Sequence, residues 1–247
     1  MASEDWQLAY HRLLTLERFK SGFLARTAHE LRSPINTIVS LHQLILEDLC
    51  EGPEEEKEFI GQSKDAALKM LALFDQIAAV SKLDIGREPP KLTAVDLSFL
   101  LPEVEILTTL QASNQNVRYT VDSPADELEI HTDAKWLKNV LASLIQDAIP
   151  HTKILRLAVE QDAESVAIVI ECDRASELLQ ADLDGLSEAM DSPPEAVAEG
   201  EAIALSTGLV LAIAHTTLPL IKGTFAIASI SGAEDRTALR CIFPAKL

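Results

Sequence analysis

Among the residues whose chemistry could be put to use, a histidine near the start of the chain is distinguished by its neighbours. His29 lies within Ala25–Asn36, whose sequence is ARTAHELRSPIN, and it is followed by Glu30 and, two residues later, by Arg32. An imidazole nitrogen is a good nucleophile near neutral pH when a neighbouring group takes its other proton. Whether His29 can react with another molecule depends on the element that holds it and on the face that it occupies.

The apolar residues around His29 recur with the period of one long helix, which we expect from about residue 4 to residue 50. Their spacing of three and four defines one buried seam, made of Leu31, Ile35, Ile38, Leu41 or His42, Ile45 and Leu49. His29 lies two residues before Leu31, which is about 200° around the helix axis. A second stripe at the same spacing carries no large apolar residue and includes Gly22, Arg26, His29, Ser33, Asn36, Ser40 and Gln43. The sequence therefore predicts that His29 faces outward from a polar helix face.

Pro34 lies within this helical pattern. A proline inside a helix removes one backbone hydrogen bond and clashes with the preceding turn, at a cost of about 3 kcal/mol or more. The carbonyl that loses its partner belongs to Glu30, the neighbour of His29. We expect a bend of the helix at this point.

A second helix is expected after Glu51-Gly52-Pro53. Pro53 suits a first helical position, and the three glutamates that follow it favour the positive end of the helix dipole. A heptad-like seam follows, in which the spacing of seven joins Ile60, Ala67, Phe74 and Ser81, with Met70 or Leu71 and Ile77 between them. A hairpin of two long helices cannot bury both of its faces, so we predict a homodimer in which two hairpins form a four-helix bundle. The alternative is that the hairpin packs against the rest of the same chain.

The chain changes character after Gly86-Arg-Glu-Pro-Pro90, because a glycine and two prolines end the helix and stiffen a linker. We expect the helical hairpin at residues 1–86, the linker at 87–92 and a second domain at 93–247. In the second domain we expect helices at 96–113, 133–149 and 205–218 and strands at 117–121, 128–131, 154–160, 166–172, 223–230 and 237–243. Helices that pack on one sheet give an α/β sandwich, so the fold class of the chain is α+β. The acidic segment Leu178–Ala202 has no lysine or arginine and is expected to be a mobile, solvated loop.

Composition narrows the classes of function. The chain of 247 residues has a net charge of −18, which disfavours nucleic acid and anionic membrane surfaces as direct partners. No run of about 18 apolar residues predicts a membrane span, and no secretory signal is visible. The three cysteines, Cys50, Cys172 and Cys241, are odd in number and far apart, so we expect reduced thiols in the cytoplasm. The histidines show no metal-binding spacing, and we predict no metal site.

The segment from His29 to Asn36, HELRSPIN, resembles the phosphoacceptor box of two-component sensor histidine kinases. The resemblance implies that His29 is phosphorylated and exchanges the phosphoryl group with an aspartate in the receiver domain of a response regulator. It implies that Glu30 acts as a base and that Pro34 bends the helix. It also implies that Ser33, with Glu30, can orient a water molecule to dephosphorylate the regulator, although threonine or asparagine is commoner there. The order of elements likewise resembles the family's dimerisation domain followed by its catalytic, ATP-binding domain.

The same resemblance implies a site for ATP and Mg²⁺ in the second domain, but the sequence departs from the family's pattern there. Ser143 and Asp147 stand where the family has two asparagines, and Pro150 replaces a lysine. Asp173 matches the aspartate that reads adenine, whereas the two glycines expected after it are replaced. Each missing glycine removes a close approach of the backbone to the nucleotide.

Of the family's glycine-rich phosphate loop, Ser206–Leu211 retains only Gly208, and the neighbouring insert is acidic. We therefore expect impaired ATP binding, with Asp147, Asp173 and Gly208 as vestigial positions. ATP and Mg²⁺ would be cofactors only if the divergent pocket still works.

These observations predict a two-component phosphorelay protein, similar to kinase-derived histidine phosphotransferases. Its partners would be a receiver domain, a second copy of the chain and, for the supply of phosphate, an upstream histidine kinase. One alternative is a soluble histidine kinase with a divergent, working ATP site, against which the lost glycines argue. The other is a catalytically silent adaptor that docks a response regulator or a kinase, against which the intact box around His29 argues.

Overall fold

The computed structural model describes residues 27–28, 30–84, 89–124, 127–188, 206–230 and 233–245. His29 and the segments 1–26 and 189–205 lie outside the described residues. The chain divides into two compact units, one of Met1–Ala78 with Asp184–Leu209 and one of Ala79–Leu183 with Val210–Leu247. Each unit is described below by itself.

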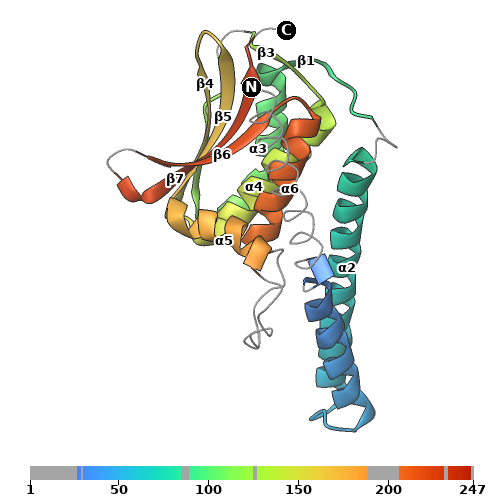
Figure 1. Ribbon diagram of the computed structural model, residues 1–247. Coiled ribbons are helices and arrows are strands. Elements are labelled where there is room, and N and C mark those ends of the chain that lie inside the picture. The colour runs from blue at the N-terminus through green and yellow to red at the C-terminus, as the bar shows by residue number, and fades with distance from the viewer. Residues whose placement is uncertain are drawn as a thin grey trace. The chain divides into compact units, whose positions relative to one another are not determined.

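The first unit contains the predicted helical hairpin (Figure 1). Residues 27–28 and 30–46 are helical, and α2 spans Pro53–Asp84. The first helix ends at residue 46, four residues earlier than expected, and Asp48 adopts a left-handed backbone with φ of 54°. Pro53 begins α2 as predicted, and three glutamates occupy its first turn. The two helices are tied by a contact of 3.3 Å between Ser63 Oγ and His42 Nε2.

The predicted seams are only partly buried within the hairpin of a single chain. The buried residues of the hairpin include Leu41 and, along α2, Ser63, Ala66 and Leu73. Two predicted heptad residues, Ile60 and Phe74, are instead 51% and 49% exposed. The predicted seam of the first helix is also partly open, because Ile35 is 45% and Leu49 is 61% exposed. The small side chains of Ser63 and Ala66 let the two helices approach, and this leaves the larger apolar residues of α2 facing outward.

The second unit is built on a five-stranded sheet with the strand order β2-β4-β5-β7-β6. The strands are β2 (Arg118–Val121), β4 (Ile154–Gln161), β5 (Ser165–Cys172), β6 (Thr224–Ile230) and β7 (Ala233–Pro244). β2 runs parallel to β4, and all other pairs are antiparallel. A separate two-stranded sheet pairs β1 (Thr93–Asp96) with β3 (Glu129–Thr132). The predicted strands are confirmed, whereas β1 was not expected.

Helices cover one face of the five-stranded sheet (Figure 1). They are α3 (Leu97–Asn114), α4 (Ala134–Ala148) with the short 3₁₀ turn η1 (Ile149–His151), and α6 (Thr207–Leu220). Asp96 and Asp133 cap α3 and α4, because their carboxylates accept hydrogen bonds from amides of the first turn. Side chains from helices and strands meet in a core with no exposed surface, which includes Leu101, Leu141, Ile145, Leu157 and Ile168.

The acidic segment expected as a mobile loop begins instead with a helix. α5 spans Ser176–Glu188, and Leu179 on it is buried. Leu179, Leu183 and Leu186 recur at spacings of four and three in a stretch without proline, a helical signal that the carboxylates masked. The rest of the predicted loop lies outside the described residues.

The turn from α6 into β6 depends on Gly223. Its amide donates to the carbonyl of Leu218 at 2.8 Å, and Lys222 before it adopts a left-handed φ of 69°. A Cβ added at Gly223 would lie 2.7 Å from Cε1 of Phe243. The missing side chain therefore lets the turn pack directly against the ring of Phe243, which is 1% exposed.

Candidate functional site

The predicted phosphoacceptor, His29, lies outside the described residues, and its outward orientation stays a prediction. Its helical neighbours Glu30 and Ser33 are half-buried, and Arg32 is exposed. Asn36 and Ser40, which continue the predicted polar stripe, are exposed. The described part of this helix therefore presents its polar stripe largely to solvent.

Pro34 is buried and lies inside the helix, which continues on both sides of it. The hydroxyl of Thr37 donates to the carbonyl of Ser33 at 3.2 Å, one turn along. A back-bond of this kind from threonine often accompanies a bend in a helix, whereas the carbonyl that Pro34 leaves without its amide partner is that of Glu30. Pro34 is thus accommodated without ending the helix.

At the vestigial ATP-site positions, Asp147 forms an ion pair with Arg174. Arg174 Nη1 lies 3.3 Å from Asp147 Oδ2, and the two side chains are 15% and 11% exposed. Asp147 is on the last turn of α4, and Arg174 lies between β5 and α5. The other guanidinium nitrogen, Nη2, lies 3.7 Å from Asp182 Oδ2 on α5. Arg174 therefore bridges two helices of the second unit.

Asp173 is engaged by three separate groups of the protein. Its Oδ2 accepts hydrogen bonds from the backbone amides of Lys153 at 3.2 Å and Ile154 at 2.9 Å. Its Oδ1 lies 3.3 Å from Arg236 Nε on β7. Its own amide donates to Thr152 Oγ1 at 2.9 Å. Asp173 thus fastens the start of β4 to the end of β5 and to β7.

Ion pairs continue from Asp173 across the sheet. Arg236 Nη2 lies 3.4 Å from Glu171 Oε2, and Glu171 Oε1 lies 3.0 Å from Arg156 Nη1. Arg156 Nε in turn lies 2.7 Å from Asp122 Oδ2. The hydrogen bond from Arg156 to Asp122 holds the pKa of Arg156 above its ordinary value. Five alternating charges therefore run from Asp122 to Asp173.

The predicted phosphate loop is helical from Thr207 onward, because these residues form the first turn of α6. Gly208 and Val210 are buried, and the amide of Leu209 donates to the carbonyl of Ser206 at 3.0 Å. Ser143 is half-buried on α4. The groups that contact Asp147 and Asp173, described above, lie on or next to β4, β5, α5 and β7. Arg174 and Arg236 were not among the predicted site residues, although Arg174 directly follows Asp173 in an otherwise acidic stretch.

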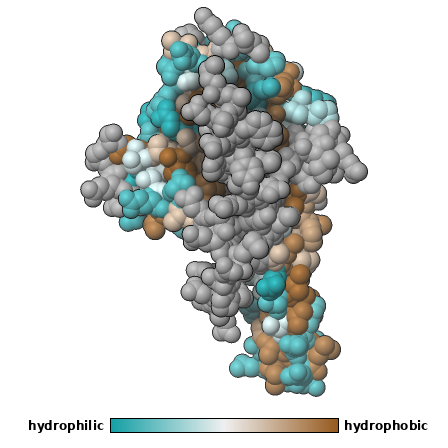
Figure 2. Space-filling model, viewed as in Figure 1, coloured by the Kyte–Doolittle hydropathy of each residue, from teal (hydrophilic) through white to brown (hydrophobic). Residues whose placement is uncertain are grey.

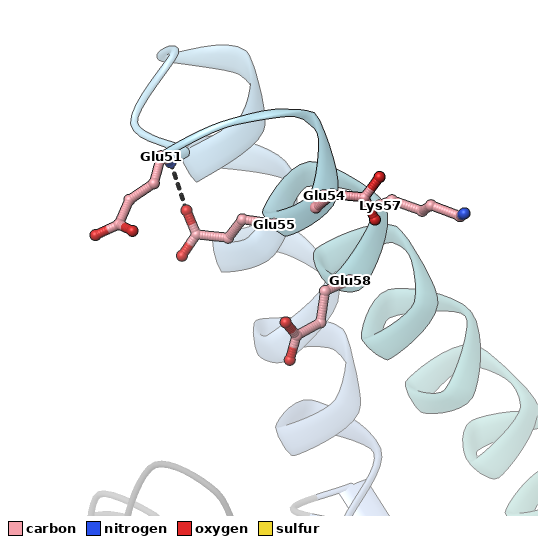
Figure 3. Close-up of a pocket in the computed structure, with 5 residues that line it drawn as sticks. All are labelled: Glu51, Glu54, Glu55, Lys57 and Glu58. Carbon is pink, nitrogen blue, oxygen red and sulfur yellow. Dashed lines mark hydrogen bonds between the residues drawn. The ribbon is translucent and has the colours of Figure 1, made fainter.

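A surface hollow of about 600 Å³ lies at the tip of the hairpin, where Figure 3 shows its lining side chains. Glu51, Glu54, Glu55, Lys57 and Glu58 line it. The amide of Glu51 donates to Glu55 Oε2 at 2.5 Å, which caps the start of α2. Four carboxylates and one ammonium group would repel phosphate, so this hollow is not a nucleotide site.

The cysteines are free thiols, as the odd number indicated. Burial raises the pKa of Cys172 to about 11 and that of Cys241 to about 12, so both remain protonated at neutral pH. Within the described ranges, no cluster of three or more histidine, cysteine, aspartate or glutamate side chains is arranged to hold a metal ion. In the same ranges, every helix is too short or too polar to cross a membrane.

The polar and apolar distribution over one face of the described residues is shown in Figure 2. The lower part of that view, at the free end of the hairpin, carries hydrophobic residues beside charged ones on its outer surface. Large apolar residues that are exposed near the end of the first helix include Leu46, which is 82% exposed, and Leu49, which is 61% exposed.

Comparison with known proteins gives a consistent result. The sequence profile of the His Kinase A (phospho-acceptor) domain matches residues 19–86. The "Non-motile and phage-resistance protein" of Caulobacter vibrioides is 29% identical over 136 residues, which are 54% of this chain and 16% of that protein. The chain spans less than a fifth of the length of the curated relatives that it matches.

Two solved structures have a similar fold. The histidine kinase AdeS of Acinetobacter baumannii aligns with a TM-score of 0.62 at 17% identity, over 89% of this chain and 98% of that chain. The histidine kinase ThkA, solved in complex with the response regulator protein TrrA, aligns with a TM-score of 0.59 at 18% identity, over 99% of this chain and 66% of that chain. The expected fold class is confirmed: a helical region is followed by an α/β domain like the ATPase domains of histidine kinases.

Proposed function

Because this chain belongs to the two-component sensor histidine kinase family, we propose that it is a phosphorelay protein with impaired ATP binding. His29 exchanges a phosphoryl group with the aspartate of a response-regulator receiver domain. The observation that carries this proposal is the match of the phospho-acceptor domain to residues 19–86, which contain His29 and the box around it.

The transfer needs only groups that the two partners supply. As the phosphorus–oxygen bond to the receiver's aspartate breaks, a phosphorus–nitrogen bond forms with one ring nitrogen of His29. Glu30 takes the proton from the other ring nitrogen, and the receiver's carboxylate is released. In the reverse direction the same steps return the group to the receiver. Ser33, with Glu30, orients water when the receiver is to be dephosphorylated.

The proposed partners are a receiver domain and a second copy of the chain. A receiver is supported by the relative ThkA, which was solved with a response regulator. A second copy is supported by the outward apolar side of α2, where Ile60, Leu71 and Phe74 are each about half exposed. Such a face is what a four-helix bundle buries. The three free cysteines support a cytoplasmic location.

Impaired ATP binding is supported by the contacts of two carboxylates. An ATP–Mg²⁺ site needs carboxylate or amide oxygens that can turn to the metal and to adenine. Asp147 is paired with Arg174, and Asp173 accepts from two amides and pairs with Arg236. The phosphate-loop positions form helix rather than an open loop. We infer that the residues present do not fit ATP–Mg²⁺, and no step of the mechanism passes through it.

The experiment is transfer of ³²P from a phosphorylated receiver to the full chain. We expect label on the wild-type protein and none on His29→Gln, while the control His42→Gln is labelled normally. Incubation with labelled ATP and Mg²⁺ should leave the wild type unlabelled. Labelling by ATP that depends on His29 would favour a working histidine kinase. Failure of His29 to accept phosphate from any receiver or kinase would favour a silent adaptor.

A further inference from the structure

Arg174 joins three elements of the second unit where the vestigial ATP-site carboxylates lie. Its guanidinium contacts Asp147 on α4 and Asp182 on α5 at 3.3 and 3.7 Å. Its carbonyl accepts a hydrogen bond from the hydroxyl of Thr237 on β7. The side chain is therefore held in place from both of its ends.

The burial of this pair indicates why a cation is needed here. The side chain of Asp147 is 11% exposed, so little water remains to stabilise its negative charge. A carboxylate at this depth needs a counter-charge, and removing one partner of such a pair leaves an uncompensated charge. Asp147 can obtain the counter-charge either from the protein or from a dissolved cation.

We propose that Arg174 is the built-in counter-ion of Asp147 and that its guanidinium excludes divalent cations from this carboxylate. The guanidinium is attached to the chain, so it does not exchange with solvent as a dissolved cation does. Unlike a divalent metal ion, it cannot coordinate the Asp147 carboxylate and phosphate oxygens at the same time. The inference rests on the proposed loss of ATP binding and assigns one part of it, the exclusion of a divalent cation from Asp147, to one side chain. It concerns the pocket alone and is independent of phosphoryl exchange at His29.

The test is the binding of Mn²⁺ to the full chain without nucleotide. Binding is measured as the decrease in the electron paramagnetic resonance signal of free Mn²⁺. Mn²⁺ should bind equally to the wild type and to Asp147→Asn, because Asp147 is already paired. Arg174→Ala should gain a site whose affinity is roughly tenfold or more above the wild type, because a positive charge next to the carboxylate is removed. Arg174→Ala combined with Asp147→Asn should lose that gain.

The matched control is Arg240→Ala, which also removes one positive charge from the second unit. Arg240 Nη2 pairs with Glu160 Oε2 at 2.5 Å, and the two side chains are 31% and 54% exposed. Its Mn²⁺ affinity should equal that of the wild type. Arg174→Lys, which keeps the charge, should also exclude Mn²⁺.

Two results would overturn the inference: Mn²⁺ binding by the wild type that is lost in Asp147→Asn, or an unchanged affinity in folded Arg174→Ala. If Arg174→Ala does not fold, the comparison of wild type with Asp147→Asn decides alone. Transfer of phosphate to His29 is measured separately on the wild type. If Mn²⁺ behaves as expected and the transfer fails, the proposed function falls and the inference about Arg174 stands.

Discussion

At the scale of single residues, Asp173 shows how a side chain that resembles a ligand-binding group can be structural. One carboxylate oxygen accepts hydrogen bonds from amides at the start of β4, and the other pairs with Arg236 on β7. Because Asp173 directly follows β5, its side chain links three strands. A carboxylate that accepts hydrogen bonds from backbone amides and also lies beside a guanidinium stabilises the folded state by more than an exposed ion pair does. The role assigned here is one of holding the sheet.

Asp173→Asn should therefore lower the stability of the fold and leave phosphoryl transfer to His29 unchanged. We expect a loss of about 1–3 kcal/mol in the free energy of unfolding, because the charge-assisted hydrogen bonds from two amides and the ion pair with Arg236 weaken. The matched control is Asp122→Asn, at the other, 53% exposed end of the row of ion pairs, which should cost about 0–1 kcal/mol. Urea unfolding measures both. Equal, small losses would contradict the structural role.

At the scale of elements, the prediction from sequence succeeded where local signals agree. The helix expected at 133–149 has apolar residues on one face, and the structure has α4 there, with Val140, Leu144 and Ala148 of that face buried and with Asp133 as its cap. β1 was missed because its four residues carry no pattern of their own and pair with β3, far along the chain. Pairing at that separation depends on the whole fold.

The predicted site likewise contains one part that local sequence could predict and one part that it could not. The box around His29 is contiguous in sequence, so its residue types and spacing could be interpreted directly. The pairing of Asp147 with Arg174 and Asp182 could not, because the three residues come from separate elements that only the folded chain brings together. The side of α2 that the first helix covers could not be predicted, since α2 has apolar residues on two sides and periodicity alone does not say which side packs within the hairpin.

Two glycines in different elements should respond oppositely to alanine. At Gly223 the new methyl group would overlap the ring of Phe243, and we expect a loss of about 1–3 kcal/mol in stability. Gly61 lies within α2 with nothing within 4 Å of an added Cβ, so Gly61→Ala should gain about 0.5–1 kcal/mol through helix propensity. Thermal unfolding compares the two variants. A stabilising Gly223→Ala would contradict the packing at this turn.

At the scale of the whole molecule, the outward face of α2 predicts association. Leu73 is 4% exposed and Phe74, the next residue, is 49% exposed, so the pair separates packing within the hairpin from packing between copies. Leu73→Ala should lower the free energy of unfolding by about 2–4 kcal/mol. Phe74→Ala should weaken self-association by about tenfold or more, because aromatic anchors dominate such interfaces. Sedimentation equilibrium measures the association.

The control for Phe74→Ala is its folding, measured separately from its self-association. Phe74→Ala should retain the helical circular-dichroism signal at concentrations where the wild type is dimeric. A wild type that sediments as a monomer at all concentrations, or a Phe74→Ala that associates as tightly as the wild type, would remove the support for a bundle of two hairpins.

Asp133 has a consequence that reaches beyond its own helix. Its Oδ1 accepts from the amides of Lys135 and Trp136 at 3.0 and 3.1 Å, while its Oδ2 accepts from the amide of Lys91 at 2.7 Å. One buried carboxylate thus protects three amides that are up to 45 positions apart in the sequence, from Lys91 to Trp136 (136 − 91). These amides should exchange their hydrogens with solvent together, as one cooperative opening. The backbone at Lys91, just before β1, and the first turn of α4 therefore loosen as a single event.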